Sequence, residues 1–227
     1  MAQAVMSTGN DELDSKMGGG IPIGSLTLIE GSSGAGKSVL SQQMIWGSLQ
    51  KGLTLTLFTS ENTVKSLVQQ MHSLDLEILD FLLLRRLRVY PVELSRLGPL
   101  GLRFLLQAMK QTPGEGLIID SLTSAIATLP AEAGLSFFEE CKRLCADGRT
   151  IIIILHSQAV NPEALVRFRS ICDAHLQLRT EGDGKRVIKL LEVTKVRGGG
   201  SATGSIVSFD VEPGWGMRMV PVNKVKG

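Results

Sequence analysis

The chain has 227 residues, of which 43% are hydrophobic and 20% charged, as in an ordinary folded globular protein. A chain of this length buries enough apolar surface to fold without disulfides or a structural metal, and its net charge of +2 is too small to indicate nucleic-acid or membrane binding. The N-terminus lacks a secretory signal, the longest apolar run (residues 151–155) is too short to span a membrane, and the three cysteines are odd in number. We therefore expect a cytoplasmic protein with reduced thiols.

Short β-branched runs alternate with helical stretches over the first two thirds of the chain, a pattern typical of a mainly parallel sheet flanked by helices. We expect strands at residues 25–30, 53–60, 88–91, 116–120 and 150–155. We expect helices at residues 37–51, 63–72, 76–87, 101–110 and 133–145. The basic cluster at residues 85–88 is interpreted as the solvated end of the third helix.

The pattern changes after about residue 173. Strand signals at residues 175–179, 187–196, 206–211 and 217–222 are separated by Gly or Asp turns, which predicts antiparallel strands added to one edge of the sheet. No linker or internal repeat divides the chain. We therefore expect an α/β fold in a single domain spanning residues 1–227.

A glycine-rich segment follows the predicted strand at residues 25–30 and leads into the predicted helix at residues 37–51. Residues 31–38 read GSSGAGKS and match the G-x-x-x-x-G-K-[ST] phosphate-binding loop in full. Such a loop directs backbone N–H groups and a helix N-terminus at the phosphates of a nucleotide, while its lysine adds a point charge. The predicted nucleotide contacts are Gly31, Ser33, Gly34, Ala35, Gly36, Lys37, Ser38 and Val39. ATP and GTP are not distinguished by any residue of the sequence.

Two acidic residues end strands that are expected near this loop. Asp120 closes the buried run GLIID and is predicted to hold magnesium, through a water, opposite the Ser38 hydroxyl. Glu61 follows the strand at residues 53–60 and is a candidate general base for an attacking water, alongside Lys37. A solvated acid at a strand end is an equally good reading of Glu61.

Two further pairs of polar residues have two readings each. His156 and Ser157 end the strand at residues 150–155 and either sense the γ-phosphate or serve the structure alone. Lys195 and Arg197 alternate along a strand end, so that both point to one face. They either reach a neighbouring subunit's nucleotide or form a solvated edge pair that discourages aggregation.

The cysteines suggest a zinc site only superficially. Cys141 and Cys145 fall on the core face of a predicted helix, and Cys172 with His175 straddles a change from helix to strand. We therefore do not expect zinc.

The segment STGNDELD at residues 7–14, followed by GGGIP at residues 18–22, resembles the opening of RecA-like ATPases related to KaiC and RadA. The residues TSENT at 59–63, the one-domain length and the tail from Phe209 to Lys226 are similar to one group among them, the FlaH (ArlH) family of the archaellum, the archaeal flagellum. The resemblance covers essentially the whole chain.

The resemblance implies a RecA-like P-loop core that binds ATP and Mg²⁺ and assembles into a ring, as in a hexamer. It implies the motor ATPase FlaI and the membrane protein FlaJ as partners, membrane association through them, and a subunit-bridging role for Lys195 and Arg197. Many relatives carry two adjacent acids where this chain has Glu61 and Asn62. The lost charge predicts weak or absent hydrolysis in a nucleotide-gated assembly component of the motor.

Two other functions remain open at this stage. One is an active KaiC-like ATPase or autokinase. The other is a RadA-like recombinase, which the acidic loop at residues 129–134 and the loop at residues 161–169, with two arginines, disfavour. No nucleic-acid partner is expected.

Overall fold

The structure is a computed structural model that describes residues 4–182, 187–198 and 204–220. The strands of its main sheet are β3 (Leu26–Gly31), β4 (Leu55–Thr59), β5 (Leu87–Pro91), β6 (Gly116–Asp120), β7 (Thr150–His156), β8 (Ala174–Gly182), β9 (Val187–Val196), β10 (Ser205–Glu212) and β11 (Gly216–Met219). Over the described residues this sheet has nine strands in the order β11-β10-β9-β8-β3-β7-β6-β4-β5. β3, which leads into the glycine-rich segment, therefore lies in the interior of the sheet.

The centre of the sheet is parallel and buried on both faces. β3 pairs in parallel with β7 and β8, and β6 pairs in parallel with β7 and β4. Every residue of β3, β4 and β6 is buried, because helices cover both faces of the sheet. The carboxyl ends of these parallel strands meet at one edge.

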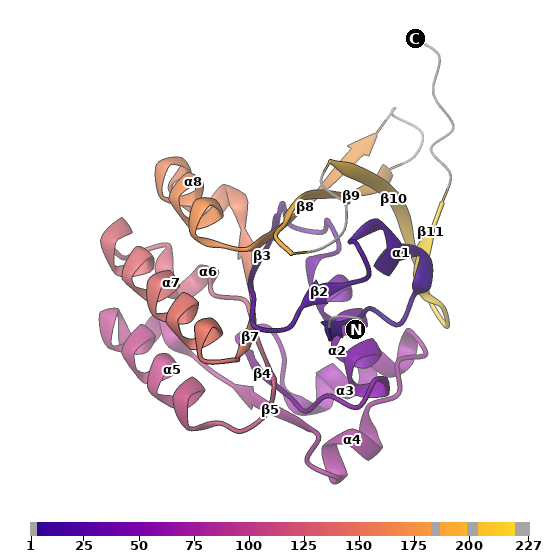
Figure 1. The fold of residues 1–227 in the computed structure, drawn as a ribbon, viewed down its shortest axis with the longest axis horizontal. Coiled ribbons are helices and arrows are strands. Elements are labelled where there is room, and N and C mark those ends of the chain that lie inside the picture. The colour runs from indigo at the N-terminus through magenta and orange to yellow at the C-terminus, as the bar shows by residue number, and fades with distance from the viewer. Residues whose placement is uncertain (1–3, 183–186, 199–203, 221–227) are drawn as a thin grey trace.

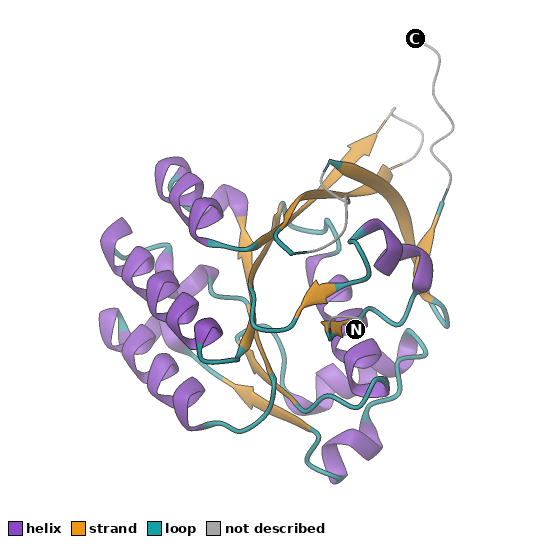
Figure 2. Cartoon of the chain, in the orientation of Figure 1, coloured by secondary structure: helices purple, strands orange, loops and turns teal. Residues whose placement is uncertain are grey.

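Helices form a layer on each face of the sheet (Figure 1, Figure 2). One layer and its apolar core contain α1 (Asp11–Lys16), α2 (Lys37–Gln50), α3 (Val64–Ser73) and α4 (Leu79–Leu83). The other contains α5 (Pro99–Gln111), α6 (Thr123–Ile126), α7 (Ala131–Ala146) and α8 (Pro162–Ile171). Two short 3-10 helices lie at Leu94–Leu97 and Ser157–Ala159. Among the described residues, no helix is both long and apolar enough to cross a bilayer. The expected mainly parallel α/β fold is confirmed.

The helix predicted for residues 76–87 is wrong over most of its length. α4 ends at Leu83, Arg85 adopts a φ of 57°, and Leu87 already pairs with Leu55 in the sheet. The basic cluster is accordingly not a solvated helix end. Arg86 donates to the backbone oxygens of Leu49 (2.8 Å) and Leu53 (3.2 Å), so this arginine ties the turn to the α2–β4 connection.

Three further expectations about the second half of the chain need correction. β8 runs parallel to β3, so the antiparallel edge begins only at β9. Residues 161–169 form most of α8 rather than a loop; Asn161 caps this helix by accepting from Glu163 N (2.9 Å), and Pro162 stands in its first turn. The last strand ends at Met219, and residues 221 and 222 of its predicted range lie outside the described residues.

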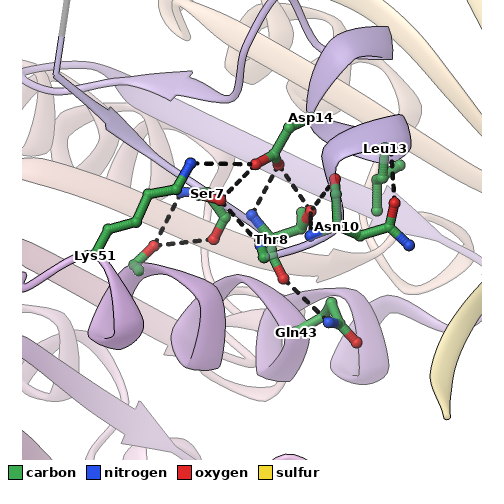
Figure 3. A network of polar contacts seen from close by, with 9 residues as sticks. Ser7, Thr8, Asn10, Leu13, Asp14, Gln43 and Lys51 are labelled. Atoms are coloured by element: carbon green, nitrogen blue, oxygen red, sulfur yellow. Dashed lines mark hydrogen bonds and ion pairs between the residues drawn. The ribbon is translucent and has the colours of Figure 1, made fainter.

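The N-terminal segment wraps onto α2 through a buried polar network (Figure 3). β1 (Val5–Met6) and β2 (Ile21–Pro22) form a two-stranded antiparallel sheet, and between them Asp14 accepts from Thr8 N (2.8 Å), Thr8 Oγ1 (2.7 Å) and Ser7 Oγ. Gln43 of α2 donates to the Thr8 backbone oxygen at 3.0 Å. A Cβ on Gly47 would lie 2.1 Å from Gly9 N, so glycine alone permits this contact. The STGNDELD segment thus fixes the helix that follows the glycine-rich loop.

We expect Asp14→Ala to lower the free energy of unfolding by about 2–4 kcal/mol, because it leaves buried hydroxyl and N–H donors without an acceptor. Urea denaturation followed by circular dichroism measures this loss. Asp11→Ala, which removes an exposed acid from the same helix, is the matched control and should cost about 0.5 kcal/mol or less. Equal losses in the two variants would show that the network contributes nothing specific.

Candidate nucleotide-binding site

The glycine-rich loop joins β3 to α2, and its last glycine begins the helix. Gly36 is the N-cap residue of α2 with a φ of 98°, a conformation that favours glycine. A Cβ at Gly36 would also lie 3.1 Å from the ring of Phe209 on β10. The loop therefore has both the backbone geometry and the close packing that require glycine, and it presents the N-terminus of α2 to an anion.

Lys37 is buried at the start of α2. Its Nζ donates to the Ser32 backbone oxygen at 2.7 Å and lies 3.3 Å from His156 Nδ1. Burial lowers the pKa of Lys37, while the charges of Asp120 and Glu61 act in the opposite direction. A buried ammonium group with neutral hydrogen-bond partners would be stabilised by an anion in the space beside it.

Asp120 lies at the carboxyl end of β6, opposite Thr59 of β4. Its two carboxylate oxygens accept from the Ser38 hydroxyl at 3.4 Å and the Ser41 hydroxyl at 3.3 Å. Burial raises the pKa of Asp120 to about 6, and the hydrogen bond from Ser38 partly opposes that shift. A hydroxyl and a carboxylate side by side are hard oxygen ligands of the kind that Mg²⁺ prefers, so Ser38 and Asp120 fit this cation.

Glu61 lies past the end of β4 and lines the same cavity as Lys37. Its Oε1 accepts from the Ser121 hydroxyl at 3.0 Å, and the side chain is otherwise exposed. Ser121 follows Asp120 directly, so the two acids are brought together by neighbouring strands. Glu61 thus lies at the cavity wall near Asp120, and its role as a general base stays a prediction.

Of the two residues predicted at the end of β7, His156 lines the cavity and Ser157 does not. His156 lines the cavity beside Lys37, and its pKa is lowered first by burial and then by the Lys37 charge. Its backbone N donates to Thr123 Oγ1 at 2.9 Å, which fixes the strand end. Ser157 begins a 3-10 helix and is not among the residues that line the cavity. The lowered pKa favours the neutral imidazole, which offers one N–H as a hydrogen-bond donor.

The cavity over the loop has a volume of about 360 Å³. It is lined by Ser33, Gly34, Gly36, Lys37, Ser38, Val39, Glu61, His156, Lys189 and Val211. Gly31 and Ala35 lie beneath this lining: Ala35 is fully buried, and a Cβ on Gly31 would lie 2.1 Å from Leu178 O. Lys189 and Val211 were not predicted, because a lysine and a valine in edge strands give no local signal of what they face.

Lys195 and Arg197 lie far from this cavity. Lys195 lies in the end of β9 that pairs with the start of β8, opposite His175, and Arg197 directly follows that end. The glycine-rich loop lies at the opposite ends of these strands. Lys195 Nζ donates to Arg169 O at 2.8 Å, and its pKa is lowered by burial and then by Arg197. Arg197 lies 3.9 Å from Asp173, with 60% of its side chain exposed. Residues 199 and 200 of this segment are outside the described residues.

The three cysteines are buried in the helical layer that contains α7. Burial raises the pKa of Cys145 to about 12 and raises those of Cys141 and Cys172 as well, so all three are thiols at neutral pH. Phe138, on the same face of α7, stacks on Phe168 of α8 with ring centroids 4.4 Å apart. These residues pack one helix against the next. No group of three or more His, Cys, Asp or Glu side chains suited to a metal occurs in the part of the chain that the structure describes.

We expect Asp120→Asn to stabilise the protein at pH 7.5 in a chelator and without nucleotide. The pKa of about 6 in the folded state lies above the ordinary value of 3.8, so stability falls as the pH rises from about 3.8 and the full loss is reached above about pH 6. The gain should reach up to about 3 kcal/mol at pH 7.5 and vanish below about pH 3, where Asp120 is protonated in both states. Thermal denaturation of both proteins across this range measures it. A gain that does not change with pH would contradict the prediction.

Comparison with known proteins agrees with this geometry. The family model of the KaiC ATPases matches residues 6–221. The archaeal flagellar ATP-binding protein FlaH of Sulfolobus acidocaldarius is 31% identical over 96% of this chain and 98% of its own length. The FlaH protein of Methanocaldococcus jannaschii is 32% identical, with 96% of each chain covered.

Two solved structures are similar over nearly the whole chain. The crystal structure of the flagellar accessory protein FlaH from Methanocaldococcus jannaschii superimposes with a TM-score of 0.81 at 27% identity, covering 97% of this chain and all of that one. A KaiC-like protein from Pyrococcus horikoshii, with a TM-score of 0.78 and 19% identity over the same shares, has the same fold. The chain belongs to the KaiC family of RecA-like ATPases and, within it, to the FlaH proteins.

Proposed function

We propose that this protein is a nucleotide-gated assembly and regulatory component of an archaeal flagellar motor, with weak or no ATP hydrolysis. The observation that carries the proposal is the group formed by Lys37, Ser38 and Asp120 where two buried parallel strands end. The relatives' names, which describe FlaH as an archaeal flagellar ATP-binding protein, support the assignment to the motor.

In this proposal the residues at the edge of the sheet bind ATP together with Mg²⁺. Backbone N–H groups of the loop and the Lys37 ammonium group hold the outer phosphates, while Ser38 and Asp120 hold the cation, Asp120 through a water. Bound Mg²⁺ supplies the positive charge that the buried Asp120 carboxylate otherwise lacks. His156 then donates a hydrogen bond toward the γ-phosphate region.

Gating requires that nucleotide binding change a surface away from the cavity. β9 suits this requirement, because one of its ends lies at the cavity and the other lies away from it. Lys195 and Arg197 lie at the edge of the sheet opposite the chain's own cavity, where a neighbouring subunit in a ring would meet them. We propose that they contact the nucleotide of that neighbour, that the chain acts as one domain in a ring such as a hexamer, and that this ring docks on FlaI and FlaJ. Its association with the membrane is then indirect.

An active KaiC-like ATPase or autokinase is the second candidate. The observation that favours it is Glu61, which lines the cavity beside Lys37 and is oriented by Ser121. Against rapid turnover stand the exposure of Glu61 and the neutral Asn62 beside it, which leave a weak base in water.

Steady-state phosphate release separates the two candidates. We expect turnover well below the roughly 1–100 s⁻¹ of typical phosphoryl-transfer enzymes, with Glu61→Gln leaving ATP affinity nearly unchanged. Because the amide keeps the shape of the side chain, a loss of activity would come from the missing base. Robust release in the wild type that disappears in Glu61→Gln would make the protein an enzyme rather than a gate.

We expect Lys37→Ala to weaken Mg-ATP binding at least roughly 100-fold, because it removes a buried charge-assisted contact to the phosphates. Calorimetry measures the affinity, and light scattering measures the particle mass with and without Mg-ATP. The mass should rise with nucleotide in the wild type and stay constant in Lys37→Ala. Lys195→Ala should bind nucleotide normally, but its particle mass should not rise with Mg-ATP, which separates assembly from binding.

Lys16→Ala, which removes an exposed lysine from the end of α1, is the control for a general loss of charge. It should match the wild type in both measurements. Unchanged affinity in Lys37→Ala would overturn the proposed binding site. Nucleotide-dependent growth that survives in Lys195→Ala would overturn only the proposed subunit contact.

A further inference from the structure

The C-terminal strands β9 and β10 lie directly over the glycine-rich loop. Lys189 of β9 pairs with Phe209 of β10, and both side chains reach Gly36. A Cβ built on Gly36 would lie 3.1 Å from the Phe209 ring and 3.7 Å from Lys189 Cδ. The methylene stem of Lys189 therefore packs against the backbone that would surround the phosphates.

The strand order places Lys189 on a definite side of the cavity. β3 carries the loop, and Asp120, His156 and Glu61 all come from strands on its β7 side. Lys189 and Val211 come from β9 and β10, beyond β8 on the other side of β3. The γ-phosphate and the cation belong with Asp120 and Glu61, so Lys189 faces the opposite part of the nucleotide.

The ammonium group of Lys189 forms no ion pair with a carboxylate of the described residues. The lysines that form ion pairs with carboxylates among the described residues are Lys51, Lys110 and Lys142, and Lys189 is not one of them. The side chain is half-buried at the cavity wall. Two lysines, Lys37 after the loop that β3 carries and Lys189 of β9, thus line one cavity of about 360 Å³.

We propose that Lys189 is a second cation of the nucleotide site, supplied by the chain's own C-terminal strands, and that it binds the α- and β-phosphate side of the nucleotide. This inference rests on the ATP binding proposed above. Lys37 holds the outer phosphates from the loop, and Lys189 closes the site from β9. Bound nucleotide then joins the loop to β9 through its phosphates.

The test compares the affinities for Mg-ATP and Mg-ADP of the full chain carrying Lys189→Met. Methionine keeps the stem that packs on Gly36 and removes the charge. Both affinities should fall by a similar factor of roughly 10, since both nucleotides carry the α- and β-phosphates. Lys189→Arg should restore most of the affinity, and added salt should reduce the difference between wild type and Lys189→Met.

Lys110→Met is the matched control, because it removes one exposed positive charge from α5, in the other helical layer. It should bind both nucleotides as the wild type does, and thermal denaturation without nucleotide should show that Lys189→Met is folded. Unchanged affinities in folded Lys189→Met overturn the inference, as does a loss for ATP alone, which would place Lys189 at the γ-phosphate. Absence of binding in the wild type would instead refute the proposed function itself.

Discussion

The structure depends on one arrangement, a buried ammonium group and a buried carboxylate held near each other at the ends of parallel strands. Lys37 and Asp120 have neutral hydrogen-bond partners, the Ser32 carbonyl for one and two serine hydroxyls for the other. Burial without a direct counter-ion is unfavourable for both charges. It lowers the pKa of Lys37 and raises that of Asp120, so that the neutral form of each is favoured. A phosphate and a divalent cation between them would remove that penalty, which makes the edge of the sheet a site that binding can stabilise.

Segments from both ends of the chain hold the helix that follows the loop. Gln43 of α2 donates to Thr8 O of the N-terminal segment, and its Oε1 lies 3.5 Å from Met217 N on β11. Within the N-terminal segment, Asp14 accepts hydrogen bonds from Thr8 N and Thr8 Oγ1 (Figure 3). The helix that follows the loop therefore contacts both the N-terminal segment and the C-terminal strand β11, which lie outside the parallel core. In the proposed gating, this contact is where nucleotide binding would act on surfaces outside the cavity.

β9 offers a second route. Lys189 stands near its beginning, over the loop, and Lys195 stands six residues later at the opposite edge of the sheet, about 20 Å away in an extended strand. β9 pairs with β8 over Val187–Val196 and with β10 over Lys189–Val193, with a register irregularity between Val193 and Lys195. The cation proposed for the chain's own nucleotide thus lies on the same strand as Lys195, and Arg197 follows that strand directly.

The sequence alone determined the features that local patterns control. The glycine spacing, the buried apolar run ending in Asp120 and the alternation of strand and helix patterns predicted the loop, the central strands and the helices beside them, because backbone sterics and burial act over a few residues. Non-local contacts decided the rest. Leu87 became a strand residue by pairing with Leu55, and β8 ran parallel to β3. α8 is a different case, because Asn161 and Pro162 are a local helix-start signal that the expectation of a loop overlooked. Lys189 joined the cavity only because β9 and β10 fold back over Gly36, and no spacing along a chain records which strand will cover a loop.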